Sequence, residues 1–133
     1  MKYFTIAELV KSNEADKRGI DNRCKKEHII NLTALVENVL DPLREAYGKP
    51  ITVNSGYRCP ALNKVVKGSP TSDHITGRAA DITGGSPDEN KKLFYLAQSI
   101  GISFDQLIDE KGFQWIHISY RGEKENRKQV RAL

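Results

Sequence analysis

Apolar residues recur at helical spacing along residues 27–47, and this pattern is the strongest structural signal in the chain. Seven positions share one face of the expected helix: Ile29, Leu32, Val36, Val39, Leu40, Leu43 and Tyr47. A stripe with gaps of three and four residues is typical of a helix that buries one side. Asp41-Pro42 interrupts the stripe, so we expect a kink or a new helix start there.

Three shorter helices are predicted from the residues that begin and end them. Thr5-Ile6-Ala7-Glu8 resembles a capping box, in which two side chains satisfy free backbone N–H groups at the start of a helix. Ser86-Pro87-Asp88-Glu89 has the same pattern and opens a helix that ends at Gly101. Pro60 suits a first helical position, and Gly68 closes a helix of about two turns.

Short segments between these helices alternate or carry strand-forming residues, and they predict four strands, at 51–54, 78–83, 104–109 and 113–120. A tight turn at Lys111-Gly112 is expected to join the last two. The order of elements indicates one α+β domain, with a small antiparallel sheet and helices packed on one side of it. We expect this domain to cover residues 1–122 and a basic C-terminal tail to cover residues 123–133.

Composition limits the classes of function. The 133 residues carry a net charge of +4, with 38% hydrophobic and 29% charged residues, as in an ordinary soluble domain. No apolar run approaches the roughly 20 residues of a membrane span, and the N-terminus lacks the apolar core of a secretory signal. We therefore expect synthesis in the cytoplasm, a monomer and no membrane partner. No aromatic-interleaved basic stripe is present, so no nucleic-acid partner is expected.

Three residues carry the candidate chemistry: His74, Asp81 and His117. Two imidazoles and one carboxylate are ligands of an open catalytic zinc site, in which the fourth position is free for water. On the last strand Ile116 and Ile118 enter the core, so His117 faces the other way. A loop and two strands would have to assemble the site. From the residues alone, ordinary structural roles for the three side chains stay an alternative.

Three separated motifs, in this order, resemble the zinc D-Ala-D-Ala peptidases. They are Ser55-Gly56-Tyr57-Arg58, then Ser72-x-His74-x-x-Gly77-x-Ala79-x-Asp81, then Trp115-x-His117. The family includes D,D-carboxypeptidases, D,D-dipeptidases and phage L-alanyl-D-glutamate endolysins, and hedgehog signalling domains share its fold. The similarity runs from about Tyr3 to Tyr120.

The resemblance implies a zinc peptidase that cuts peptide bonds in the stem peptides of cell-wall peptidoglycan. It implies that His74, Asp81 and His117 hold Zn²⁺ and that Arg58 grips a substrate carboxylate, which a planar guanidinium does through two parallel hydrogen bonds. Ser72 matches a motif serine that either donates to the substrate or shapes the loop. Such an enzyme would act at the cell wall, after release in the manner of a phage lysin or after export by a route that the sequence does not reveal.

One position departs from the family pattern. Many relatives carry a carboxylate three residues before the last histidine as general base, and here that position is Gln114, whose amide cannot take a proton. With a two-residue turn, Glu110 would pair with Phe113, on the face of His117 but roughly 13 Å along the strand from it. We favour Glu110 as the base, because small members of the family place a glutamate after a Gln-Leu-Ile phrase. Asp109 is the second candidate, and a non-catalytic zinc-containing wall-binding module is the alternative function.

Overall fold

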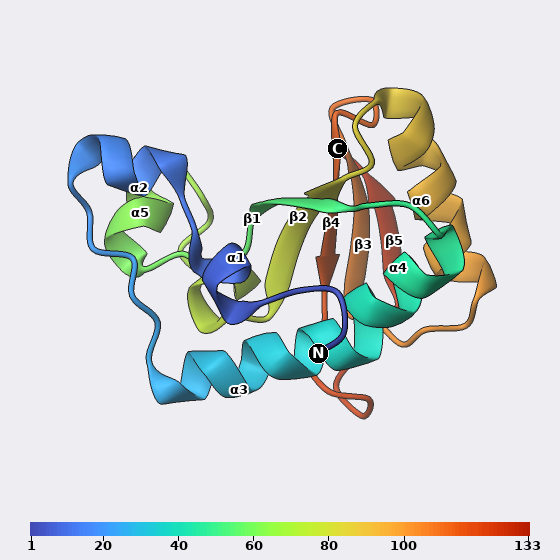
Figure 1. Cartoon of the computed structure of the whole chain (residues 1–133), viewed down its shortest axis with the longest axis horizontal. Coiled ribbons are helices and arrows are strands. Elements are labelled where there is room, and N and C mark those ends of the chain that lie inside the picture. The colour runs from blue at the N-terminus through green and yellow to red at the C-terminus, as the bar shows by residue number, and fades with distance from the viewer.

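A sheet of five strands organises the structure, which is a computed structural model describing residues 1–133. The strands lie in the order β1-β2-β4-β3-β5 (Figure 1). Their bounds are β1 Thr52–Ser55, β2 Ala79–Thr83, β3 Gln106–Glu110, β4 Trp115–Ser119 and β5 Gln129–Ala132. The pairs β1–β2, β2–β4 and β3–β4 are antiparallel. The predicted α+β domain with its four strands is confirmed.

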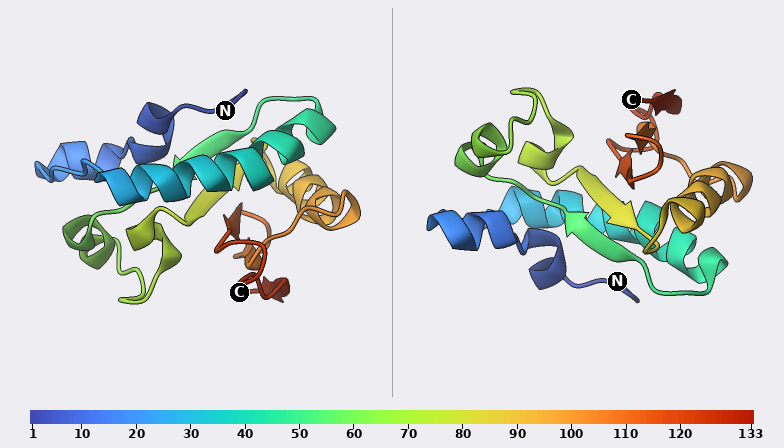
Figure 2. Two further views of the ribbon diagram at one scale, coloured as in Figure 1. Left: turned by 90° about the horizontal axis from the view of Figure 1, so that it is seen from below. Right: turned by 90° about the horizontal axis from the view of Figure 1, so that it is seen from above.

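Eight helical segments accompany this sheet. They are α1 Ile6–Val10, α2 Asn13–Arg18, α3 Lys26–Leu35, the π-helical η1 Val36–Leu40, α4 Asp41–Tyr47, α5 Pro60–Val65, the 3₁₀ turn η2 Asp73–Thr76 and α6 Pro87–Ser99. The run from α3 through η1 to α4 lies across the sheet, and α4 contacts α6 (Figure 2). None of the helices combines the length and the apolar character that a membrane crossing requires.

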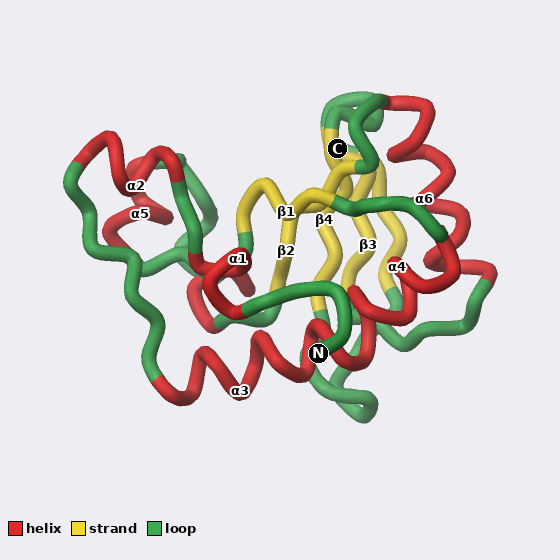
Figure 3. The backbone as a smooth tube through the Cα atoms, viewed as in Figure 1, coloured by secondary structure: helices red, strands yellow, loops and turns green.

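The amphipathic segment at 27–47 forms one helical run, with a local change of geometry where Asp41-Pro42 interrupts its stripe (Figure 3). Proline has no N–H to donate, and its ring clashes with the carbonyl four residues earlier in a regular helix. The five residues of η1, immediately before Asp41, take the wider π geometry. The run continues through Pro42 instead of ending, so the expected interruption appears as a π turn.

The core forms between this helical run, α6 and one face of the sheet. It contains 19 buried residues. The helices contribute, among others, Leu32, Leu35, Val39, Leu40, Leu43 and Leu93, and the strands contribute Ala80, Ile82, Leu107, Ile116 and Ile118. Because side chains alternate along a strand, the residues between them project from the opposite face. That opposite face carries Asp81 and His117.

The expected small antiparallel sheet gains a parallel strand at one edge. Strand β5 pairs in parallel with β3, with Ile108 opposite Arg131, so the sheet is mixed. Residues 123–133, expected as a basic tail, thus include a strand of the sheet. This strand is largely exposed. Its residues alternate between polar and apolar, with Val130 and Ala132 on the apolar positions, but so short a run in a basic segment does not by itself indicate a strand.

A buried carboxylate holds the segment before β5. Asp105 is 0% exposed, and its Oδ1 accepts hydrogen bonds from the backbone N–H and the Nε of Arg127, at 3.0 and 2.9 Å. Its Oδ2 accepts from Nη2 of Arg127 at 2.8 Å. These hydrogen bonds from Arg127, together with the charge of Arg121, outweigh burial and hold the pKa of Asp105 below its usual range.

Replacing Asp105 with asparagine is expected to lower the free energy of unfolding by about 1–3 kcal/mol at neutral pH, because the guanidinium loses its charged acceptor. The folded-state pKa is depressed, so this stabilisation is present above the unfolded value of about 3.9 and is lost as pH falls through the folded value. Urea denaturation of both proteins at pH 7 and pH 3 measures the difference, with Glu123→Gln as an exposed control. An equal difference at both pH values would contradict the assignment.

Candidate metal centre

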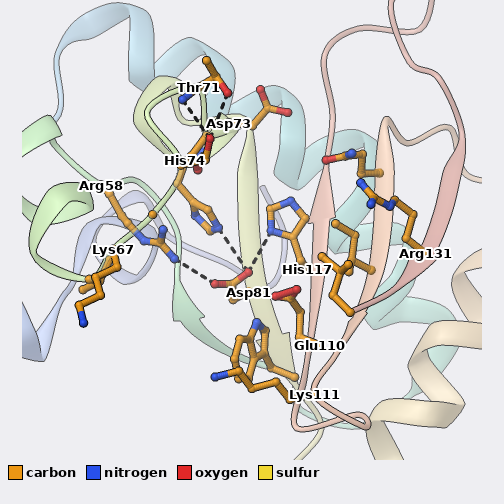
Figure 4. A pocket seen from close by; sticks show the side chains of 18 of the residues that line it. Arg58, Lys67, Thr71, Asp73, His74, Asp81, Glu110, Lys111, His117 and Arg131 are labelled. Carbon is orange, nitrogen blue, oxygen red and sulfur yellow. Dashed lines mark hydrogen bonds and ion pairs between the residues drawn. The ribbon is translucent and has the colours of Figure 1, made fainter.

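The structure brings His74, Asp81 and His117 together on the sheet face opposite the core (Figure 4). Their potential ligand atoms all lie within 4.8 Å of one another. Asp81 on β2 is directly opposite His117 on β4, and His74 comes from η2 at the near end of β2. A loop and two strands therefore form the cluster, as expected from the sequence.

Local interactions shape the turn that carries His74. The hydroxyl of Ser72 accepts a hydrogen bond from the backbone N–H of His74 at 3.1 Å and so caps η2. Gly77 ends η2 with a φ of +79°, a conformation that side chains disfavour. A Cβ at Gly77 would also lie 2.8 Å from the backbone oxygen of His28. Ser72 and Gly77 thus turn the chain so that His74 faces Asp81.

The hydrogen bond that one ring nitrogen of His74 makes determines whether the other ring nitrogen carries a proton. Nδ1 of His74 lies 2.6 Å from the carbonyl oxygen of Gly56. A carbonyl only accepts, so Nδ1 carries the proton. In the neutral ring Nε2 then has a lone pair, and it faces Oδ1 of Asp81 at 3.3 Å. Two acceptors at this distance repel each other unless a proton or a metal cation lies between them.

The backbone at Gly56 requires glycine for this arrangement. A Cβ at this position would lie 2.2 Å from the carbonyl oxygen of Leu9, closer than any real contact. The neighbouring Tyr57 donates its backbone N–H to the same carbonyl at 2.9 Å. The close approach of these two segments keeps the carbonyl of Gly56 in place for His74, which explains the glycine in the Ser55-Gly56-Tyr57-Arg58 motif.

The donor set fits a zinc ion. Oδ1 of Asp81 lies 3.3 Å from Nε2 of His74 and 3.1 Å from Nδ1 of His117. Ligands at about 2.0–2.1 Å from a tetrahedral zinc ion are separated from one another by roughly 3.3 Å. Imidazole nitrogen and carboxylate oxygen are ordinary zinc ligands, and three protein ligands leave one position open. The residues present therefore suit this metal in chemistry, and the two distances from Asp81 suit its spacing.

The carboxylate of Asp81 is ionised although it is only 8% exposed. Burial raises the pKa of this carboxyl, but when the rings are protonated the charge of His74 and hydrogen bonds from both histidines outweigh burial and hold the pKa of Asp81 well below its usual range. Oδ2 of Asp81 accepts a hydrogen bond from Nη2 of Arg58 at 3.2 Å. One oxygen of the carboxylate is thus held by Arg58, and the other faces both histidines.

Arg58 is fixed by three partners. Its Nε donates to the hydroxyl of Ser55 at 3.0 Å, its Nη1 to the side-chain oxygen of Asn63 at 3.2 Å, and its Nη2 to Asp81. Burial lowers the pKa of Arg58, while the nearby carboxylates of Asp81 and Glu110 oppose that shift. A guanidinium has five N–H donors, so two stay available to a ligand. Sequence reasoning missed Ser55 and Asn63 as residues that position this group.

The loop between β3 and β4 has four residues, 111–114, where a two-residue turn was expected. Three of them have positive φ: Lys111 at 51°, Gly112 at 68° and Phe113 at 64°. Glu110 pairs with Trp115, so the expected pairing with Phe113 is wrong. Glycine is the residue that usually indicates a positive φ in a sequence. Lys111 and Phe113 give no such indication, so the sequence predicted too short a loop.

The longer loop brings Glu110 closer to the candidate metal ligands than expected. Ile108 lies directly opposite His117, so Glu110 is the diagonal neighbour of His117 on the same face. Diagonal neighbours in an antiparallel pair are about 7–8 Å apart, well below the expected 13 Å. Burial and the negative charge of Asp81 raise the pKa of Glu110, partly offset by His117 and Lys111. A carboxylate with a raised pKa is suited to take up and return a proton.

The two other candidates near this loop face elsewhere. Asp109 pairs with Ile116 in the adjacent, core-facing row, and its side chain accepts a hydrogen bond from the backbone N–H of Phe113. Gln114 is exposed and does not line the cleft. Glu110 is therefore the carboxylate of this hairpin that shares a cleft with the three ligands.

The cleft over this face has a volume of about 810 Å³. Besides the three candidate ligands, the residues that line it include Arg58, Lys67, Ser72, Asp73, Ile108, Glu110, Lys111, Trp115, Arg121, Arg127 and Arg131. The indole Nε1 of Trp115 is buried and has no acceptor, and it is the one such side-chain atom in the structure. Sequence reasoning treated Arg131 as part of a tail, so its place in this cleft is new.

Comparisons with known proteins agree with this architecture. The chain is 48% identical over 48 residues to the zinc D-Ala-D-Ala carboxypeptidase of Streptomyces albus G. That alignment covers 35% of this chain and 19% of the relative, so the chain matches about a fifth of that protein's length. Residues 2–119 match the peptidase M15 family. Because this match covers most of the 133 residues, the chain belongs to the peptidase M15 family.

Proposed function

We propose that the protein is a zinc peptidase that hydrolyses peptide bonds in the stem peptides of peptidoglycan, of the D-Ala-D-Ala carboxypeptidase or endopeptidase type. One observation carries the proposal: Oδ1 of Asp81 faces a nitrogen of each of two histidines, at 3.1 and 3.3 Å, in a cleft shared with Glu110. The carboxypeptidase from Streptomyces albus G supports the choice of metal and of substrate class.

In this proposal Nε2 of His74, Oδ1 of Asp81 and Nδ1 of His117 hold Zn²⁺. When bound, zinc polarises the scissile carbonyl and lowers the pKa of water to about 7. The carbonyl of Gly56 keeps the proton of His74 on Nδ1 and so leaves Nε2 free for the metal, which is a common role for groups that contact a metal ligand. Arg58 holds the second oxygen of Asp81 and so orients its carboxylate.

Glu110 is the proposed general base. Its carboxylate takes a proton from the attacking water and delivers it to the nitrogen of the leaving amine. Its raised pKa suits the first half of that transfer, because a less acidic carboxyl group accepts the proton more readily. The side chain of Trp115, opposite Glu110 in the sheet, helps to exclude bulk water.

Arg58 and Ser72 are the proposed substrate-binding residues. The two free N–H groups of Arg58 suit a bidentate contact with a carboxylate of the peptide. Ser72 already accepts a hydrogen bond from the backbone of His74, and its hydroxyl proton stays available to a substrate carbonyl. Ser72 would thus shape the loop and contact the substrate at once.

Incubation of the zinc-loaded protein with purified peptidoglycan tests this function. We expect new amine ends, and mass analysis of the fragments identifies whether D-Ala-D-Ala, L-Ala-D-Glu or a cross-bridge bond is cut. Excess chelator should abolish the release and lower the melting temperature by several degrees, because a ligand that binds only the folded state stabilises it. The chelated protein should stay folded, since its core does not depend on the metal.

The outcomes separate the two candidate functions. Sedimentation of the protein with peptidoglycan without any release of amines would support the non-catalytic wall-binding module. A melting temperature that does not respond to zinc or chelator would contradict the metal site itself.

A further inference from the structure

The proposed ligands belong to a row of side chains that crosses the sheet. Asp81 on β2 is opposite His117 on β4, His117 is opposite Ile108 on β3, and Ile108 is opposite Arg131 on β5. All four side chains therefore project from the same face and line the cleft. Figure 4 shows Arg58 and Arg131 on opposite sides of His117.

Arg131 differs from the neighbouring arginines in having no partner. Arg121 contacts Asp73 at 3.2 Å, and Arg127 is tied to Asp105. No hydrogen bond or ion pair engages the side chain of Arg131 anywhere in the structure. Its guanidinium, next to the apolar Ile108, is thus a free bidentate donor at the far wall of the cleft.

The balance of charge in the cleft favours an anionic ligand. Asp81 is compensated by Arg58, and Asp73 by Arg121. Lys67 and Lys111 line the cleft without ion-pair partners, as Arg131 does. Glu110 is the one cleft carboxylate outside an ion pair. Walls with excess positive charge raise the local concentration of anions and the rate at which they bind.

The spacing of the strands indicates how many residues of a bound peptide would span this row. Neighbouring strands are about 4.8 Å apart, so the backbone of β5 lies roughly 10 Å from that of β4. An extended peptide advances about 3.3 Å per residue. A peptide crossing the strands with its scissile carbonyl at His117 therefore reaches Arg131 about three residues away, after passing over Ile108.

We propose that Arg131 forms a second carboxylate subsite, specific for an acidic residue about three positions to the N-terminal side of the cleaved bond. The inference rests on the proposed function, in which Arg58 binds a carboxylate of the peptide, and it takes that carboxylate as lying on the C-terminal side of the cleaved bond. The two arginines then hold the peptide at both ends of the row. Amidation of the acidic side chain removes the charge that Arg131 binds, so the subsite distinguishes a carboxylate from its carboxamide.

Two synthetic peptides test the subsite. They are identical except for a carboxylate or a carboxamide three residues before the cleaved bond, which is located by mass analysis. The wild-type protein should cleave the acidic peptide with a kcat/KM roughly 10- to 100-fold higher, the usual range for one hydrogen-bonded charge. In Arg131→Gln this preference should disappear through a rise in KM for the acidic peptide, with kcat and the cleavage of the amide peptide unchanged.

The control variants separate recognition from structure. Lys128→Gln removes an exposed cation from the same segment outside the cleft and should keep the preference, and Arg131→Lys should restore part of it. An Arg131→Gln variant that keeps the preference, or that loses activity equally on both peptides, would overturn the subsite and leave Arg131 as a charge on an edge strand. Cleavage of neither peptide by the wild-type protein would overturn the proposed function, and the subsite with it.

Discussion

Replacement of His117 by alanine is expected to abolish both stoichiometric zinc binding and peptide hydrolysis. The variant retains His74 and Asp81, and two ligands do not form the three-residue site that holds a catalytic zinc ion. Loss of the metal removes several kcal/mol of transition-state stabilisation, and each 1.36 kcal/mol is a factor of ten in rate. The rate should therefore fall by at least about a thousandfold.

Metal analysis of the purified variant and the release of amines from peptidoglycan measure the two losses. His28→Ala is the matched control, because His28 stacks on Tyr57 with ring centroids 4.5 Å apart and lies outside the cleft. We expect the control to retain zinc and activity. Undiminished hydrolysis by His117→Ala would exclude the proposed metal site.

Replacement of Glu110 by glutamine is expected to leave zinc bound while kcat falls about 10²- to 10⁴-fold, the usual contribution of a general acid–base group. The amide has the shape of the carboxylate but cannot take a proton from water. Because Glu110 lies in the cleft without being one of the three ligands, metal content and melting temperature should change little. Combining metal analysis with steady-state kinetics separates this result from that for His117.

Asp109→Asn is the companion variant. The side chain of Asp109 accepts a hydrogen bond from the loop residue Phe113, so its loss should reduce stability more than it reduces kcat. Full activity of Glu110→Gln together with a large loss of kcat in Asp109→Asn would move the general base to Asp109. Full activity of both variants would remove the carboxylate from the mechanism.

Local patterning predicted the elements with a buried face. The helical run over 27–47 and the alternation of Ile116 and Ile118 around His117 follow directly from which side chains leave water. Strand β5 buries neither face, because it is an exposed edge whose partner lies about twenty residues earlier in the chain. It is held by the buried contact between Asp105 and Arg127. These two residues are far apart in the chain, so no local sequence pattern predicts their contact.

The candidate site likewise contains residues that local motifs predict and contacts that depend on the tertiary structure. His74, Asp81 and His117 stand in short motifs with a family resemblance, so the sequence alone predicted the three side chains that the structure brings together. The hydrogen bond from Arg58 to Asn63 depends on how α5 follows β1, and the place of Glu110 depends on backbone angles at Lys111 and Phe113. The side chains at these positions are compatible with several loop conformations, so their identity does not specify the loop.

The carboxylate of Asp81 has one oxygen toward the histidines and the other on Arg58. If Asp81 holds the metal and Arg58 the substrate, as in the proposed function, metal affinity and substrate affinity are thermodynamically linked through a single side chain. A peptide carboxylate that binds the guanidinium of Arg58 weakens the hydrogen bond from Arg58 to Asp81. More of the negative charge of Asp81 is then available to the metal cation. Linkage is reciprocal, so the metal-loaded protein binds such a peptide more tightly than the apoprotein by the same factor, even where peptide and metal do not touch.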